Sequence, residues 1–209
     1  MPVSLSPDSN LQQARFEQAI ALFDAANAAD PNMEAVGSQL RPKELVYAER
    51  MSEMLQRFAP DAGDAVKLAV RAQHIQRWTV PRNTYPMTPE GYKQWRTGLY
   101  KFHAETAGAL MREAGYDDAA IEQVARIVAK KGIKVNDDSQ LLEDIASMVF
   151  LEHYLTAFAA QHPEYDEAKW CDIIKKTWQK MSAKARDFTL LGHISLPSDL
   201  TPLIVKAIT

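Results

Sequence analysis

The stretch Gln73-His74-Ile75-Gln76-Arg77-Trp78-Thr79-Val80-Pro81-Arg82 gathers polar, basic and aromatic side chains where an apolar helix gives way to a loop. Val66, Ala69 and Val70 lead into it at helical spacing. Pro81 cannot continue the helix, because its ring removes the amide donor and clashes with the preceding turn. The stretch therefore predicts a helix end rich in charged and aromatic groups.

Helical periodicity extends in both directions from this stretch, and no segment shows the alternation typical of a strand. Pro31, Pro60, Gly115 and Gly132 separate the periodic segments, as helix-breaking residues do. The sequence predicts an all-α fold: a single-domain bundle of about seven helices over residues 1–209. We expect a core at about residues 10–186 and a C-terminal tail, residues 187–209, that packs on it.

Composition limits the function classes. The 209 residues are 46% hydrophobic, enough for one sizeable core, and the net charge of −3 argues against a protein that coats nucleic acid. Cys171 is the lone cysteine, and the amino terminus lacks the charged-then-apolar pattern of a secretion signal. No apolar run approaches the roughly 18 residues of a membrane span. We expect a soluble, cytoplasmic protein without membrane association, and homo-oligomerisation stays open.

The most apolar predicted helix, from about Asp137 to Phe158, carries a carboxylate on its buried side. Asp144 lies three residues after Leu141 and four before Met148, which places it on or beside the apolar stripe. An isolated buried carboxylate is costly, so Asp144 requires a cation, a metal or several hydrogen-bond donors.

Two histidines on other predicted helices offer a metal as that partner. His74 and His103 each lie one turn beyond an apolar residue, and facing helices of bundles hold divalent metals with nitrogen and carboxylate ligands. We therefore expect His74, His103 and Asp144 to converge on one divalent ion, with Glu49 as the fourth protein group. The competing interpretation is a hydrogen-bond network in which a histidine donates to Asp144 without a metal.

The arginines in and near the stretch of residues 73–82 suggest the class of ligand. Arg77, Arg82 and Arg96 can pair bidentately with phosphate, and Trp78 and Trp95 can stack on a base. This favours a nucleotide or another small phosphorylated ligand. In the alternative interpretation the tryptophans are core anchors, and the arginines cap helix ends or pair with acidic residues.

Four segments carry a resemblance to a known family. They are Leu45-Val46-Tyr47-Ala48-Glu49-Arg50-Met51, Gln73-His74-Ile75-Gln76-Arg77-Trp78, Gly91-Tyr92-Lys93-Gln94-Trp95-Arg96 and Gln140-Leu141-Leu142-Glu143-Asp144. Across about Phe16 to Met181 the chain resembles an all-helical family of bacteria and fungi known as a domain of unknown function. The order of helices is more remotely similar to the HD-domain superfamily of metal-dependent phosphohydrolases.

The HD-domain resemblance implies roles for particular residues. His103 and Asp144 match an auxiliary histidine and the final aspartate of that family, and it implies Glu49, His74 and Asp144 as the catalytic group. Substrate-binding positions implied by the two resemblances and the arginine cluster are Tyr47, Gln73, Arg77, Trp78, Arg82, Trp95, Arg96, Lys130, Lys131 and Gln140.

The chain departs from the HD pattern where the first histidine and the His-Asp pair are expected. Tyr47 and Gln73 stand there, and a phenol with a pKa of about 10 is a poor metal ligand at neutral pH. Either the metal is held by Glu49, His74, His103 and Asp144, or the pocket has lost the metal and keeps an anionic ligand. Three functions follow: a metal-dependent phosphohydrolase acting on a nucleotide or other small phosphorylated metabolite, a non-catalytic nucleotide or anion sensor, and a helical protein-interaction module.

Overall fold

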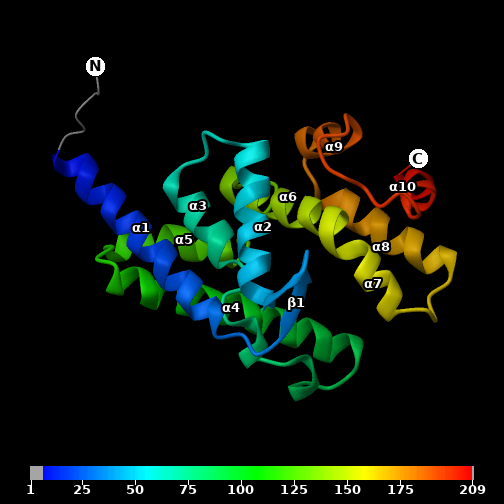
Figure 1. Ribbon diagram of the computed structural model, residues 1–209, viewed down its shortest axis with the longest axis horizontal. Helices are drawn as coiled ribbons and strands as arrows, with labels where there is room; N and C mark the ends of the chain where they lie inside the picture. Colours follow the sequence, from blue (N-terminus) through cyan, green and yellow to red (C-terminus); the bar gives the residue numbers. More distant parts are fainter. Residues whose placement is uncertain (1–6, 209) are drawn as a thin grey trace.

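A computed structural model describes residues 7–208 of the chain, and it is built almost entirely of helices (Figure 1). The all-α prediction is confirmed, but the described residues form ten α-helices instead of about seven. The ten are α1 (Pro7–Ala28), α2 (Lys43–Phe58), α3 (Asp64–Ala72), α4 (Pro89–Glu113), α5 (Asp118–Val128), α6 (Asp137–Val149), α7 (Leu155–Gln161), α8 (Glu167–Lys180), α9 (Ala183–Leu190) and α10 (Thr201–Ile208). Two short 3-10 turns, η1 (Arg77–Thr79) and η2 (Arg82–Thr84), lie between α3 and α4.

Helix α6 occupies the centre of the molecule. It packs against α2, α3, α5, α8 and α9, and Leu142, Ile145 and Met148 are completely buried. In Figure 1 helices α1, α3 and α5 lie mainly to the left of it and α7 to α10 to the right, while α2 crosses it and α4 runs below. The apolar segment of the sequence therefore supplies the core helix that joins the two sides, as its hydrophobicity predicts.

The long helix expected up to Phe158 is interrupted. A π-helical turn, η3 (Phe150–Tyr154), separates α6 from α7, and this division raises the helix count. A π turn inserts an extra residue per turn and is frequent at functional sites. Periodicity alone did not reveal it, because apolar residues continue through the turn without a break.

The expectation of no strands is wrong for one hairpin. Strands β1 (Met33–Val36) and β2 (Gln39–Pro42) pair antiparallel around the two-residue turn at Gly37 and Ser38. Gly37 has φ +58°, which suits a tight hairpin turn that most side chains would strain. Ion pairs from Arg41 to Glu49 and from Arg50 to Glu34 hold the hairpin against α2.

The C-terminal residues pack onto the body of the protein. Helix α10 lies against α8, with Ile204 and Ala207 buried, and α9 contacts α6. Among the residues that the structure describes, no helix has the length and apolar character needed to cross a membrane.

Candidate functional site

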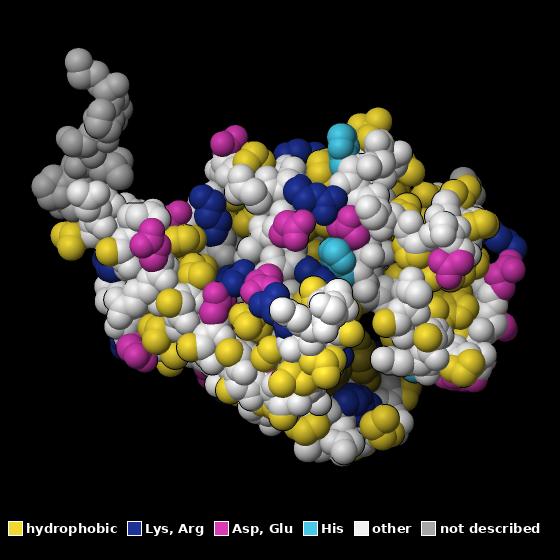
Figure 2. All heavy atoms as spheres, in the orientation of Figure 1, with side chains coloured by type: hydrophobic (Ala, Val, Ile, Leu, Met, Phe, Trp, Pro, Cys, Tyr) yellow, Lys and Arg dark blue, Asp and Glu magenta, His cyan; other side chains and the backbone are white. Residues whose placement is uncertain are grey.

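A cavity of about 850 Å³ lies between the hairpin, the facing ends of α2 and α3, the first half of α4, and α6 to α8. Figure 2 shows a dark recess on this face, right of centre, with basic and apolar side chains around it. Eight residues singled out from the sequence line the cavity: Tyr47, Gln73, His74, Arg77, Trp95, Arg96, His103 and Lys130. Three residues of the stretch of residues 73–82, namely Gln73, His74 and Arg77, thus line the cavity.

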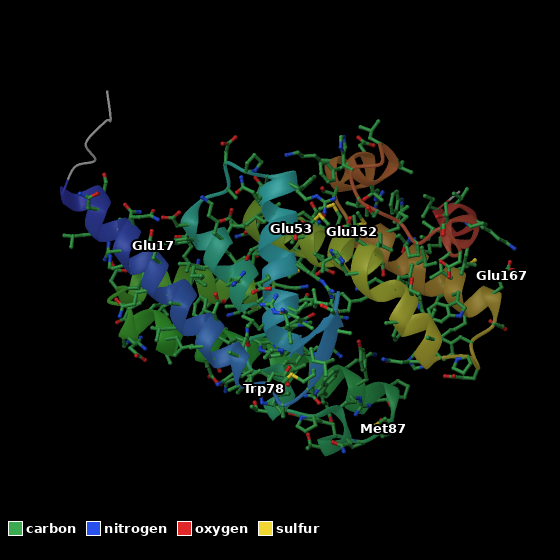
Figure 3. All side chains as sticks on the ribbon, in the orientation of Figure 1. Glu17, Glu53, Trp78, Met87, Glu152 and Glu167 are labelled. Carbon is green, nitrogen blue, oxygen red and sulfur yellow. The ribbon has the colours of Figure 1, made fainter. Side chains whose placement is uncertain are left out.

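Several predicted ligand-binding residues lie outside this cavity. Arg82 donates to the carbonyl oxygens of Tyr85 and Pro86 at 3.0 and 2.8 Å, so its guanidinium closes the loop before α4. Lys131 is exposed beyond α5. Trp78, labelled in Figure 3, lies to the left of the recess, near the lower end of α1. Arg82 and Lys131, both expected to bind the substrate, therefore do not line the cavity with Arg77.

Asp144 is buried, as predicted, but its partners are all protein hydrogen-bond donors. The Ser182 amide and hydroxyl donate to it at 2.7 and 2.5 Å, and the Gln140 amide donates at 2.9 Å. Gln140 also donates to the carbonyl of Lys180, so neither Gln140 nor Asp144 faces the cavity. The sequence left open a cation, a metal or several hydrogen-bond donors as partners of Asp144, and the structure shows several donors. Through them the carboxylate fixes α6 to the junction of α8 and α9.

The four expected metal ligands are not assembled together. Glu49 accepts two hydrogen bonds from Arg41 at 2.7 and 2.8 Å, and Asp144 is held by Ser182. Only His74 and His103 lie near each other, with ring centroids 5.9 Å apart. Within residues 7–208 no group of three or more histidine, cysteine or acidic side chains has an arrangement that could hold a metal ion. The predicted donor set therefore does not fit a divalent ion in this arrangement.

The floor of the cavity is formed by Glu44, Tyr47 and His74 near the start of α2 and the end of α3. The His74 ring stacks on Tyr47 with centroids 4.1 Å apart, and His74 Nδ1 lies 3.5 Å from a Glu44 carboxylate oxygen. Asp30 accepts the Glu44 amide hydrogen at 3.0 Å and so fixes the first turn of α2. These contacts hold a carboxyl group and an imidazole at the cavity surface.

Burial shifts the pKa values of these groups strongly. It raises the pKa of Glu44 to about 7, against the opposing effect of Arg77, and the neighbouring Asp30 raises it further. Burial also lowers the pKa of His74 well below its usual value, with additional lowering by Arg77, Lys130 and Lys43. At neutral pH His74 is therefore neutral while Glu44 is poised between its two protonation states.

His103 on α4 presents a free ring nitrogen to the same region. Its Nδ1 lies 2.9 Å from the Ile75 carbonyl oxygen, which can only accept, so the proton is on Nδ1. Its Nε2 is buried without a hydrogen-bond partner in the described chain. Burial, together with His74, lowers the His103 pKa to about 3. A lone pair on Nε2 is thus available to a donor on a bound ligand.

Two arginines supply positive charge without a matching carboxylate among the described residues. The Arg77 guanidinium lies 5.1 Å from the Trp95 ring centroid, and its Nε is buried with no hydrogen-bond partner in the part of the chain that the structure describes. Arg96 donates to the Tyr100 hydroxyl at 2.6 Å. Neither arginine forms a salt bridge with an acidic side chain within residues 7–208. Trp95 is itself fixed by donating to the Val80 carbonyl at 2.9 Å.

Lys130 reaches the cavity because of an unusual helix end. After α5 it has φ +52°, and the amides of Lys130 and Lys131 bond back to Ile127 and Arg126 in the pattern of a glycine-type cap. The left-handed conformation is unfavourable for a lysine. Its ammonium group forms an ion pair with the buried Glu143, and burial, which would raise the Glu143 pKa, is outweighed by Lys130 and Lys180.

Sequence reasoning missed several residues that line the cavity, notably Glu44, Glu143, Tyr154 and Lys180. Glu143 precedes Asp144. The apolar stripe predicted Asp144 as the site residue, but Glu143 is the one that lines the cavity. Glu44 follows Pro42 in the first turn of a helix, where acidic residues are ordinary. Nothing in their local spacing distinguishes either residue from a surface carboxylate.

The chain belongs to the family described as "Domain of unknown function (DUF4202)", whose model matches residues 17–204. The resemblance to an all-helical family of this kind is thereby confirmed. Comparisons with curated proteins and with solved structures give no match.

Proposed function

We propose that the cavity binds a small phosphorylated metabolite, a class that includes nucleotides. The observation that carries the proposal is the pair of guanidinium groups, Arg77 and Arg96, that line the cavity without an acidic partner in residues 7–208. Guanidinium groups form bidentate, charge-assisted hydrogen bonds with phosphate. Such a ligand would supply the anionic partner that both side chains lack within the described chain.

The remaining charges along the cavity support an anionic ligand. Of the acidic residues that line it, Glu34 is paired with Arg50, and Glu143 is paired with Lys130 and lies 3.7 Å from Lys180. Glu44 is partly protonated at neutral pH, because its pKa is raised to about 7 by burial. Arg77 and Arg96, with Lys43 at the rim, therefore leave the cavity with excess positive charge.

Isothermal titration with inorganic phosphate, adenosine monophosphate and a sugar phosphate tests this proposal. Losing one charge-assisted pair costs about 1.5–3 kcal/mol, so we expect Arg77→Gln and Arg96→Gln each to weaken binding roughly 10-fold to 100-fold. Arg126→Gln is the matched control, because Arg126 is exposed on α5 and pairs only with Glu122 one turn away. Equal affinities for all three variants and the wild type would contradict the proposal.

Hydrolysis of the bound phosphate ester is a second candidate. Glu44, with a pKa raised to about 7 by burial, lies at the cavity floor 3.5 Å from His74. A group that titrates near the working pH is suited to general acid–base catalysis. Ionised Glu44 would take a proton from a water molecule as the water oxygen bonds to phosphorus. It would then give a proton to the alkoxide that leaves as the ester P–O bond breaks. The HD-domain resemblance of the sequence supports the same reaction class.

A phosphatase screen with Glu44→Gln separates hydrolysis from binding. Hydrolysis predicts turnover by the wild type and a loss of at least 100-fold in Glu44→Gln with binding retained. The HD-domain resemblance also implies a divalent ion, although the expected ligands are separated and the step above uses only protein groups. Elemental analysis of freshly purified protein measures metal content independently of activity.

A further inference from the structure

Another part of the cavity lining differs in chemistry from the arginines. It is built from the end of α6, the π turn, α7 and α8, and Ala146, Phe150, Ala157, Phe158 and Ile173 line it. We call these five residues the apolar wall. The rings of Phe150 and Phe158 meet edge to face with centroids 5.9 Å apart, and Phe158 also packs on Trp170. These contacts fix the aromatic surface in place.

The cavity has room for a ligand much larger than a phosphate group. Pockets of about 300–1,000 Å³ take drug-sized molecules, and this cavity, at about 850 Å³, is near the top of that range. A phosphate held by Arg77 and Arg96 would fill only part of it. The rest of the ligand would meet the apolar wall.

We propose that the apolar wall binds a hydrocarbon chain or ring of the same ligand, which is therefore an amphipathic phosphate ester. This inference rests on the proposed phosphate binding and names the other half of the molecule. The ligand spans the cavity with its phosphate at Arg77 and Arg96 and its hydrocarbon group against Phe150 and Phe158. Removing that group from water supplies binding energy that the arginines alone cannot.

A nucleotide base fits this wall less well than hydrocarbon does. A base carries several polar atoms on its edge, and burying them without partners loses affinity. Beside the apolar wall, the Thr177 hydroxyl already donates to the Ile173 carbonyl at 3.1 Å, and Gln161 is exposed at the end of α7. Tyr154 packs against Tyr47 and Arg50 on the hairpin side. The five residues of the apolar wall themselves carry no polar side-chain group that could recognise a base edge.

Titration with a series of alkyl phosphates tests the inference. Methyl, butyl and hexyl phosphate share a head group and differ only in apolar length. Burying one methylene contributes about 0.8 kcal/mol, so affinity should rise by up to about fourfold per added carbon. Arg77→Gln should weaken all three ligands by a similar factor, because it acts on the shared phosphate.

A neutral polar substitution in the wall supplies the matched comparison. Ala157 and Ala160 are both exposed on α7, but only Ala157 lines the cavity. Ala157→Asn should flatten the increase from methyl to hexyl phosphate and leave methyl phosphate binding within about twofold of wild type. Ala160→Asn should retain the full increase. Neither change removes a buried side chain, so both variants should fold.

The outcomes separate this inference from the function on which it rests. Equal affinity for all three alkyl phosphates, lost in Arg77→Gln, would overturn the apolar subsite and leave phosphate binding intact. Tighter binding of adenosine monophosphate than of hexyl phosphate would also overturn it, in favour of a base. If no phosphate ester binds, both proposals fail.

Discussion

Asp144 and Glu44 are both buried carboxylates on helices, with 3% and 6% of their surfaces exposed, but their surroundings differ. Burial raises the pKa of Asp144, and three hydrogen bonds from Ser182 and Gln140 oppose this rise. The Glu44 carboxylate lies 3.5 Å from His74 Nδ1, and burial raises its pKa to about 7. A carboxylate whose hydrogen bonds come from neighbouring helices joins the fold together, whereas one left facing a cavity can act on a ligand.

Glu143 provides a third case between these two. It is buried and lines the cavity, but Lys130 neutralises it through a buried ion pair. Its charge therefore stabilises the fold through Lys130, although the residue lines the cavity. The three carboxylates make different demands on substitution, and the following experiments exploit that difference.

The largest effect is expected for Lys130→Met, which leaves Glu143 buried with only Lys180 at 3.7 Å. Breaking a buried pair by removing one partner typically costs 3–5 kcal/mol, and we expect about 4 kcal/mol in the free energy of unfolding. Urea denaturation measures it. Lys131→Met is the control, because Lys131 is adjacent but exposed. Equal stability of the two variants would mean that the ion pair contributes little.

Asp144→Ala should be the next most destabilising change. It removes the acceptor for the Ser182 amide and hydroxyl, and unpaired buried donors cost about 1–3 kcal/mol each, so we expect a loss of about 3 kcal/mol. Affinity for a phosphorylated ligand should stay unchanged, because Asp144 lies outside the cavity. Asp187→Ala, an exposed site on the neighbouring α9, is the control. If Asp144→Ala lowered the affinity for the phosphorylated ligand but not the free energy of unfolding, Asp144 would have a role in ligand binding instead of a structural one.

Sequence periodicity predicted most of the fold for a clear physical reason. Helices bury one face, so apolar residues recur along them, and this places α6 at the centre with Asp144 inside. The hairpin carried a short signal, Gly37-Ser38 between two brief strands, that helical periodicity obscured. The π turn left no signal, because its effect is to rotate the chain without changing composition.

The site was predicted in part. His74 and Arg77 were expected near one another and near Trp95, because proline and polar residues mark a helix end at residues 73–82. All three residues line the cavity. Glu44 and Lys180 come together with them only through tertiary packing, and no spacing along the chain encodes that. Lys130 was anticipated, but its left-handed backbone, which aims it inward, is invisible in the sequence.

Glu44→Gln should change how stability depends on pH. The folded pKa of about 7 exceeds the usual value of 4.5, so Glu44 favours the folded state most at low pH and loses this contribution as pH rises through 7. The shift corresponds to about 3 kcal/mol in full, of which about 2 kcal/mol should separate pH 5 from pH 8. The variant should therefore be more stable than wild type at pH 8 and similar at pH 4.5.

Denaturation of both proteins between pH 5 and pH 8 measures the difference. Ionised Glu44 raises the pKa of His103, so the substitution lowers that pKa further, but in both folded proteins His103 is neutral above pH 5. His103 has a pKa lowered to about 3 by burial and His74, so its contribution is present above pH 6.5 and is lost at lower pH. Subtracting wild type from variant at each pH cancels that part. A difference that does not vary with pH would show that Glu44 titrates normally.

The smallest effect is expected for Glu49→Gln, the residue that the HD-domain resemblance implied as a metal ligand. Its carboxylate is partly exposed and pairs with Arg41 of the hairpin, and exposed ion pairs contribute little to stability. Ligand affinity, metal content and any phosphatase activity should match those of wild type, because Glu49 does not line the cavity. Thermal unfolding, titration and elemental analysis of the same preparation check all of these. A coupled loss of metal and activity would mean that Glu49 moves to the site when a ligand binds, and it would remove the distinction between scaffold and site carboxylates drawn from Asp144 and Glu44.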